Sequence, residues 1–314
     1  MNNTVSTAGV LWATCELNGG NGYFSGTDLV TGQEIFSIQL GPMMTPEGFA
    51  VNKNNTIAWI TDSYNDRIII VDLVTQSVTG FVTTREVDGA MITPFQVALS
   101  PDETRLYVTG DTTKSLEIID TVNNIRLPGI ALPGHARGVT VSPDGKTVYV
   151  ALYNTNQIGI IDVESALVTD ALSVGQMPME IVLSKEGTTL YVANQDGNSI
   201  AAVDTGTKEV AYIALDDSPR SLALSASELY LYVGTLASGV YTVDLASAEV
   251  IGSVQLPFSS NSVDVSPDDS SVYAMAYEVD GPQPTPVIVM DSPTVKITGS
   301  LSVNGFGRYM QVTA

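Results

Sequence analysis

A sequence unit repeats seven times along this chain of 314 residues, and the repeat limits the possible folds more than any other feature. Three consecutive units read VALSPDETRLYVTGDTTKSLEIID, VTVSPDGKTVYVALYNTNQIGIID and IVLSKEGTTLYVANQDGNSIAAVD, at residues 97–120, 139–162 and 181–204. Successive units start about 40–48 residues apart, a period typical of four short strands with their turns. The repeat therefore predicts radially arranged β-sheets, the blades of a propeller.

Two marker residues count the units. An aromatic residue in the second hydrophobic run occurs at Trp12, Trp59, Tyr107, Tyr149, Tyr191, Tyr232 and Tyr273. An aspartate ends the third run at Asp28, Asp72, Asp120, Asp162, Asp204, Asp244 and Asp291. Both series predict seven blades.

The unit at 139–173 shows the strand pattern most clearly. Residues 139–141 form a first strand that ends at the turn Ser-Pro-Asp-Gly, in which proline presets φ and glycine accepts a positive φ. Residues 147–151 are β-branched or aromatic and form a second strand. Residues 158–161 form a third, and the more polar residues 167–173 form a fourth that is expected to be outermost.

The two ends of the chain complement each other. The first unit, at 10–40, has no first strand before it, and the segment RYMQVT at 308–313 aligns with FQVALS at 95–100. We therefore expect the C-terminal strand to join the N-terminal blade, which removes an exposed sheet edge. The sequence thus predicts a single all-β domain over residues 1–314, a seven-bladed β-propeller of four-stranded antiparallel blades.

Charge excludes some partners. The chain carries 13 Lys and Arg against 34 Asp and Glu, a net charge of −21. Nucleic acids and anionic membrane surfaces repel such a protein, although the charge also simply favours solubility. No apolar run approaches the ~18 residues of a membrane-spanning helix. The single cysteine, Cys15, excludes an internal disulfide.

The units resemble those of YVTN-repeat propellers. The motif is seen in the sequences LYVT at 106–109 and LYVAN at 190–194, and the resemblance extends over essentially the whole chain. It implies the seven-bladed fold and an extracytoplasmic location, either periplasmic, secreted or at a surface layer. Residues 1–10 contain no basic and apolar segments of a signal peptide.

A candidate ligand site follows from aligning the seven units at the start of the innermost strand. One residue from each unit falls at the same level of the expected channel mouth: Glu47, Phe95, Arg137, Met179, Arg220, Asn261 and Arg308. Glu180 and Tyr309 stand at the next position. Guanidinium groups that converge there can bind a carboxylate or phosphate. The alternative is that the arginines pair with neighbouring carboxylates such as Glu47 or Glu180.

His135 precedes this level by two residues and is the only histidine. It cannot build a multi-histidine metal centre, but a single imidazole can act as a general base. An exposed loop histidine without a role is the simpler interpretation, and no catalytic residue is assigned.

No cofactor is predicted from the sequence. The marker aspartates lie in different units and form no calcium-loop motif, so we expect them to accept backbone N–H groups of the following turn. Weak calcium binding is conceivable at the acidic loops 62–66 and 216–217.

Three functions remain open. The leading expectation is a non-catalytic propeller that presents its loops to a protein, glycan or cell-surface partner. The alternative is a lactonase- or lyase-like enzyme that acts on a small anionic substrate at the channel mouth. A third is a structural subunit of an extracellular assembly.

Overall fold

The computed structural model describes residues 9–17, 20–85, 90–237, 239–276 and 284–314. All regular structure in these residues is β-strand: 28 strands form seven four-stranded antiparallel sheets. The fold is the all-β seven-bladed propeller that the repeat predicts. Contacts group the chain into two compact units, residues 44–218 and residues 1–43 with 219–314, so its description as one domain stays a prediction.

Residues 44–218 contain four sheets, each built from consecutive strands. The first two sheets contain β4 (Phe49–Val51), β5 (Ile57–Asp62), β6 (Arg67–Asp72) and β7 (Ser77–Thr83), then β8 (Pro94–Leu99), β9 (Arg105–Gly110), β10 (Ser115–Asp120) and β11 (Ile125–Ala131). The next two contain β12 (Ala136–Val141), β13 (Thr147–Leu152), β14 (Gln157–Asp162) and β15 (Leu167–Ser173), then β16 (Pro178–Leu183), β17 (Thr189–Asn194), β18 (Ser199–Asp204) and β19 (Val210–Ala214).

The other unit contains three sheets. Two are consecutive: β20 (Pro219–Leu224), β21 (Tyr230–Thr235), β22 (Gly239–Asp244) and β23 (Glu249–Gln255), then β24 (Ser260–Val265), β25 (Ser271–Ala276), β26 (Thr285–Asp291) and β27 (Ile297–Val303). The third joins the chain ends: β1 (Val10–Leu17), β2 (Asn21–Asp28), β3 (Glu34–Gly41) and β28 (Phe306–Thr313).

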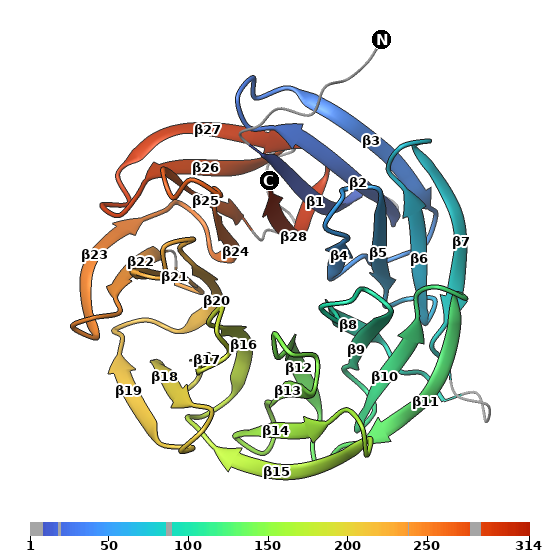
Figure 1. Cartoon of the computed structure of the whole chain (residues 1–314). Helices are drawn as coiled ribbons and strands as arrows, with labels where there is room; N and C mark the ends of the chain where they lie inside the picture. The colour runs from blue at the N-terminus through green and yellow to red at the C-terminus, as the bar shows by residue number, and fades with distance from the viewer. Residues whose placement is uncertain (1–8, 18–19, 86–89, 238, 277–283) are drawn as a thin grey trace. The chain divides into compact units, whose positions relative to one another are not determined.

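The C-terminal strand β28 lies beside β1, as the alignment of the chain ends predicts (Figure 1). The two strands are antiparallel, with Val10 opposite Thr313 and Thr14 opposite Tyr309. The Trp12 indole N–H donates a hydrogen bond of 3.0 Å to the Thr313 hydroxyl. The last strand of the chain therefore satisfies the backbone groups of the first.

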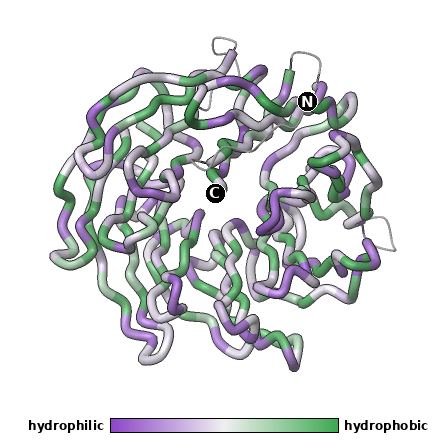
Figure 2. The backbone as a smooth tube through the Cα atoms, turned by 45° about the horizontal axis from the view of Figure 1, so that its top comes forward, coloured by the Kyte–Doolittle hydropathy of each residue, from purple (hydrophilic) through white to green (hydrophobic). Residues whose placement is uncertain are grey.

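The hydrophobic faces of neighbouring sheets form the core. Six of the seven aromatic markers are buried, and Tyr191 is partly buried. One cluster joins Tyr107, Leu116 and Ile118 to Val148 and Val150, which belong to the next sheet. The second strands are buried on both faces, as in β5, β9 and β13, where all residues but the first are buried. Figure 2 shows hydrophobic and hydrophilic segments mixed along the chain. The outermost strand of each sheet is more exposed than the other three, as the polar pattern at 167–173 predicts.

The marker aspartates accept backbone N–H groups of the following turn, which confirms their predicted role. All seven do so: Asp28, Asp72, Asp120, Asp162, Asp204, Asp244 and Asp291. Hydrogen bonds from the turns, by backbone N–H groups or by hydroxyls such as that of Ser165, hold the pKa of the last six below the usual value. The protein's own hydrogen bonds therefore hold these turns.

Asp264 on β24 connects its sheet to the C-terminal strand. Its carboxylate accepts the Val312 N–H of β28 at 2.7 Å and its neighbour Val265 N–H at 2.8 Å. Burial nevertheless raises the pKa of Asp264 to about 6. The folded protein therefore holds this proton more tightly than the unfolded chain, and the ionised form weakens the fold as the pH rises toward 6.

Replacing Asp264 by asparagine is expected to remove this pH dependence. Between about pH 4 and 6, the free energy of unfolding of the wild type should fall by about 1–3 kcal/mol relative to D264N, since one pKa unit corresponds to about 1.4 kcal/mol. The turn aspartates are present in both proteins, so their contribution cancels. Urea unfolding curves at several pH values measure the difference, and parallel pH profiles would contradict it.

Candidate functional site

The residues predicted for the channel mouth lie at the starts of the innermost strands. In residues 44–218, Glu47 precedes β4, His135 precedes β12, and Arg137 and Glu180 lie in the first half of β12 and β16. In the other unit, the predicted residues are Arg220 on β20, Asn261 on β24, and Arg308 and Tyr309 on β28.

Arg137 is the centre of a polar and aromatic cluster. Its Nη2 lies 3.0 Å from Oδ1 of Asp111, and the two side chains are 20% and 32% exposed. Its guanidinium carbon lies 3.9 Å from the ring centroid of Phe95, within the range of a cation–π contact, and 5.5 Å from that of Tyr153. The Thr109 hydroxyl also donates 2.7 Å to the Arg137 carbonyl oxygen. The guanidinium is therefore held in place from several sides.

Tyr153 and His135 extend the cluster. The Tyr153 hydroxyl donates to Oδ1 of Asp111 at 3.2 Å, and its ring centroid lies 6.1 Å from that of His135. Burial, together with the nearby Asp111, raises the pKa of Tyr153, so the phenol stays protonated and acts as a donor. The His135 backbone N–H is fixed by Oδ1 of Asn154 at 2.8 Å.

Two polar atoms of this cluster are shielded from solvent and have no hydrogen-bond partner among the described residues: Nε of Arg137 and Nδ1 of His135. Native proteins rarely leave buried polar atoms unpaired, and a bound ligand or water commonly supplies the missing partner. The cluster thus offers a guanidinium and an imidazole, each with hydrogen-bonding capacity left for a ligand.

Gly138 brings the neighbouring strand close to this cluster. A Cβ atom at Gly138 would lie 2.7 Å from the Met179 carbonyl oxygen and 3.2 Å from Cα of Glu180. Only glycine permits this approach of β12 and β16. The second predicted carboxylate, Glu180, therefore belongs to the strand that lies directly beside Arg137.

The other unit pairs its two arginines differently. Nη2 of Arg308 contacts Oε2 of Glu16 at 2.5 Å, in a pair that is 15% and 21% exposed. Arg220 donates through Nε to the side-chain oxygen of Asn261, and the Asn261 amide donates 2.9 Å to the Arg308 carbonyl oxygen. The Tyr309 carbonyl accepts the Thr14 hydroxyl at 3.3 Å. Asn261 thus connects the two arginine-bearing strands.

Three residues that contact the predicted site residues were not predicted from the sequence. Asp111, Tyr153 and Glu16 lie in or after second strands, outside the aligned level. Asp111 could have been noticed in the sequence, because it directly follows the second strand of its unit, at the position that Tyr153 occupies in the next unit. Spacing alone does not show that these loops approach Arg137.

The acidic loop at 62–66 is already satisfied by the protein. Asp62 is fully buried and contacts Nε of Arg67 at 2.8 Å, and Asp66 accepts the Ile92 and Thr93 N–H groups at 3.1 and 2.8 Å. Across the described ranges, no three His, Cys, Asp or Glu side chains are grouped as metal ligands. Among the same residues, no helix is long and apolar enough to cross a membrane.

Comparison with known proteins supports the fold. Residues 111–215 match the family model "Lactonase, 7-bladed beta-propeller". That segment contains Asp111, His135, Arg137 and Tyr153. The match covers about one third of the chain. The narrower resemblance to YVTN-repeat, surface-layer proteins stays a prediction, and no curated protein matches the chain.

Several solved structures share the propeller fold. Hydrazine synthase of Kuenenia stuttgartiensis has a TM-score of 0.75 and 18% identity, over 93% of this chain and 98% of that chain. A functionally unknown protein from Desulfotomaculum acetoxidans has a TM-score of 0.80 and 15% identity, over 98% and 99%. A putative 6-phosphogluconolactonase from Bacteroides fragilis has a TM-score of 0.78 and 14% identity, over 100% of both chains. At these identities the likeness shows the fold alone.

Proposed function

We propose that this protein is a hydrolase that opens the lactone ring of a small anionic organic acid at the Arg137 cluster. The observation that carries the proposal is the position of Asp111, His135, Arg137 and Tyr153 inside the segment that matches the lactonase propeller model. Arg137 Nε and His135 Nδ1 support it, because neither has a hydrogen-bond partner among the described residues and a bound ligand would supply one.

Each residue has a distinct role in this proposal. Arg137 binds the anionic group of the substrate, held in place by Asp111 and the Phe95 ring. His135 accepts a proton from a water molecule as its oxygen attacks the lactone carbonyl carbon. The ring C–O bond then breaks, and the departing alkoxide takes up the proton, which yields the open hydroxy acid. Histidine suits this role because imidazole exchanges protons near neutral pH.

The test is the rate of ring opening above the spontaneous rate. Purified protein is mixed with δ-gluconolactone and with its 6-phosphate, and acid release is followed in a pH-stat. We expect acceleration of the phosphorylated lactone over the neutral one, since Arg137 recognises an anion. If neither lactone is accelerated while the 6-phosphate or 6-phosphogluconate binds in calorimetry, the site is a binding site only and the enzymatic proposal is wrong.

Replacing Arg137 by glutamine is expected to raise KM for the phosphorylated lactone by about 10- to 150-fold, the loss of one charged hydrogen bond worth about 1.5–3 kcal/mol. The kcat should change far less, because the anionic group is bound equally in the ground state and the transition state. The matched control is R105Q, at the opposite end of β9 from Asp111. Equal effects of R137Q and R105Q on KM would contradict the assignment.

A further inference from the structure

A cavity lies at the outer edge of the sheet β8–β11, and its lining departs from the repeat. Its volume is about 730 Å³, within the range of small-molecule sites. Three cations line it, Arg85, Lys114 and Arg126, with one carboxylate, Glu117. The lining carries a net charge of +2 (three cations less one carboxylate) in a chain of net charge −21. Leu127, Pro128 and Ile130 form an apolar wall. We call this cavity the blade-three groove.

Glu117 is buried where the other sheets place an uncharged residue. The aromatic marker Tyr107 pairs with Ile118 on the third strand, and Glu117 directly precedes Ile118. The residues at the same position in the other six sheets are Ser25, Ile69, Gly159, Ala201, Tyr241 and Ile288. The Glu117 side chain has no exposed surface, and Gly129 leaves room for it. A carboxylate at this position is therefore not required to build a blade.

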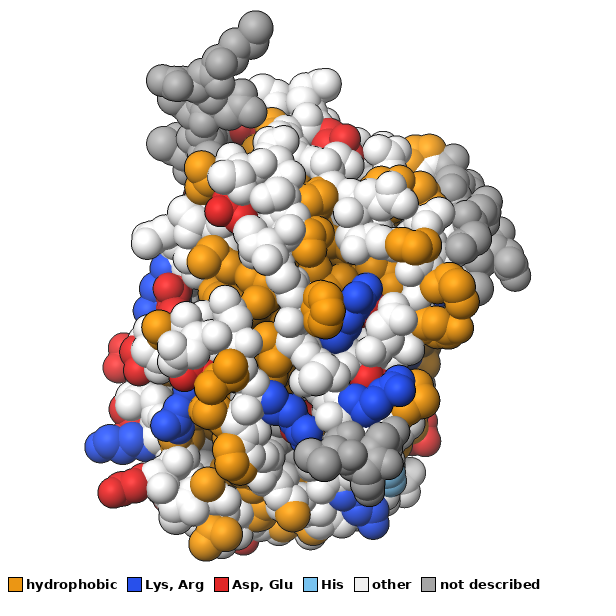
Figure 3. Space-filling view, turned by 90° about the vertical axis from the view of Figure 1, so that its right-hand side faces the viewer, with side chains coloured by type: hydrophobic (Ala, Val, Ile, Leu, Met, Phe, Trp, Pro, Cys, Tyr) orange, Lys and Arg blue, Asp and Glu red, His pale blue; other side chains and the backbone are white. Residues whose placement is uncertain are grey.

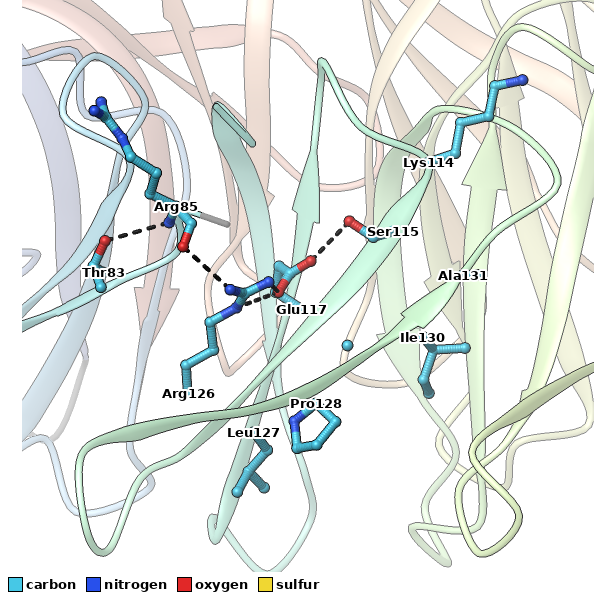
Figure 4. A pocket seen from close by; sticks show the side chains of 11 residues that line it. Thr83, Arg85, Lys114, Ser115, Glu117, Arg126, Leu127, Pro128, Ile130 and Ala131 are labelled. Carbon is cyan, nitrogen blue, oxygen red and sulfur yellow. Dashed lines mark hydrogen bonds and ion pairs between the residues drawn. The ribbon is translucent and has the colours of Figure 1, made fainter. Parts of the chain in front are cut away.

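Arg126 is the second departure, and it contacts the first. Its guanidinium donates to Oε2 of Glu117 at 2.6 Å and to the Arg85 carbonyl oxygen at 3.2 Å (Figure 4). In five other sheets the equivalent residue is aliphatic, Val78, Val168, Val210, Val250 or Ile297, and in the sheet of β1 it is Glu34. Desolvation makes such a buried pair a poor source of stability compared with aliphatic residues.

Lys114 is the third departure. Its carbonyl oxygen accepts the N–H of Leu132, which follows the outermost strand of the sheet. In three other sheets the residue whose carbonyl makes the same hydrogen bond is Asp66, Asn156 or Asn198. In those three residues the side chain also accepts hydrogen bonds from the next connection. The lysine ammonium cannot accept such a bond, and Lys114 instead lines the blade-three groove.

The two outer cations flank the buried pair. Figure 4 shows Lys114 and Arg85 on opposite sides of Glu117 and Arg126, with the Leu127–Pro128 wall beside the pair. The Arg85 side chain is 48% exposed, and its Nη2 lies 3.3 Å from Oδ2 of the buried Asp66. Figure 3 faces the side of the molecule on which β7 and β11 lie, and shows Lys and Arg side chains among hydrophobic ones.

We propose that the blade-three groove binds an elongated organic dianion, with one anionic group at Lys114, the other at Arg85, and an apolar body along Leu127 and Pro128. Three charged departures in one sheet meet in one cavity, and the repeat shows that none of them is needed for the fold. This site is independent of the lactone hydrolysis proposed above, because it uses none of the same residues.

Calorimetric titration with a series of dicarboxylates tests the proposal. Succinate, adipate and suberate are compared with hexanoate, which matches adipate in length but has a single carboxylate. We expect one dicarboxylate to bind best and to bind at least about tenfold tighter than hexanoate, a difference of about 1.4 kcal/mol. Absence of binding by all three dicarboxylates, or equal binding of adipate, suberate and hexanoate, would overturn the proposal.

Variants separate binding from folding. E117I/R126V copies Ile69 and Val78 from the neighbouring sheet, so it should fold with an unchanged or higher melting temperature. Dicarboxylate binding should weaken about tenfold or more, because Arg126 no longer holds Arg85 through its carbonyl oxygen. K114M should weaken binding similarly, and the matched control K146M, an exposed lysine in the 142–147 turn, should not. Wild-type affinity in both K114M and E117I/R126V would refute the site.

Discussion

Deletion of residues 307–314 is expected to unfold the chain at room temperature. The deletion removes all but the first residue of β28, the only other partner of β1 besides β2. It leaves the backbone groups of β1 without their antiparallel partner and removes Met310, which is 1% exposed, from the core cluster around Ala13 and Met275. The free energy of unfolding of a domain is only about 5–15 kcal/mol, so the loss of a whole strand removes most of the stability.

Circular dichroism and thermal melting measure this loss. Because the truncated chain can fail to accumulate as soluble protein, the substitution M310A provides a milder test. It should destabilise the fold by about 2–5 kcal/mol, the usual cost of truncating a buried methionine. The control M310L preserves volume and should cost less than about 1.5 kcal/mol. A truncated protein with the wild-type melting temperature would show that β28 does not hold the N-terminal sheet.

Replacement of His135 by glutamine is expected to reduce lactone turnover by about 10²- to 10⁴-fold, the usual contribution of a general base. Glutamine retains hydrogen-bonding capacity but cannot accept a proton from water near neutral pH. The rate of ring opening of the phosphorylated lactone by both proteins, followed in a pH-stat at one neutral pH, is the measurement.

The fold should not suffer from this change. The His135 backbone hydrogen bond to Asn154 is retained, and Nδ1 has no partner to lose. An unchanged melting temperature together with lost turnover therefore separates chemistry from stability. Turnover of H135Q within about twofold of the wild type would exclude His135 as the base, whatever role Arg137 has, because removing a base costs far more.

The repeat made the local fold predictable. Residues 167–173 form β15 with the predicted bounds, and the strands predicted at 147–151 and 158–161 appear as Thr147–Leu152 and Gln157–Asp162. The first strand begins at Ala136, three residues earlier than expected. Its pairing with β13 has a register shift between Ala136 and Val139, which breaks the regular pattern at the start of the strand. A period of alternating side chains does not reveal such irregularities.

The candidate site was only partly predictable. Alignment drew attention to Arg137, and to His135 two residues earlier, because both precede the first strand predicted at 139–141. Asp111 and Tyr153 entered only with the structure, where Asp111 contacts both the guanidinium and the phenol. They come from two different units, and contacts across units depend on loop paths that the repeat leaves free to vary.

Sequence alone determined the number of blades, the strand order and the pairing of the chain ends, because each follows from periodicity and from turn chemistry that act locally. Only the tertiary structure decided which charges meet. Glu117 and Arg126 look unremarkable in the sequence, yet they form a buried pair at 2.6 Å. The reason is that side-chain contacts depend on distances between strands, and those distances are set by packing rather than by position along the chain.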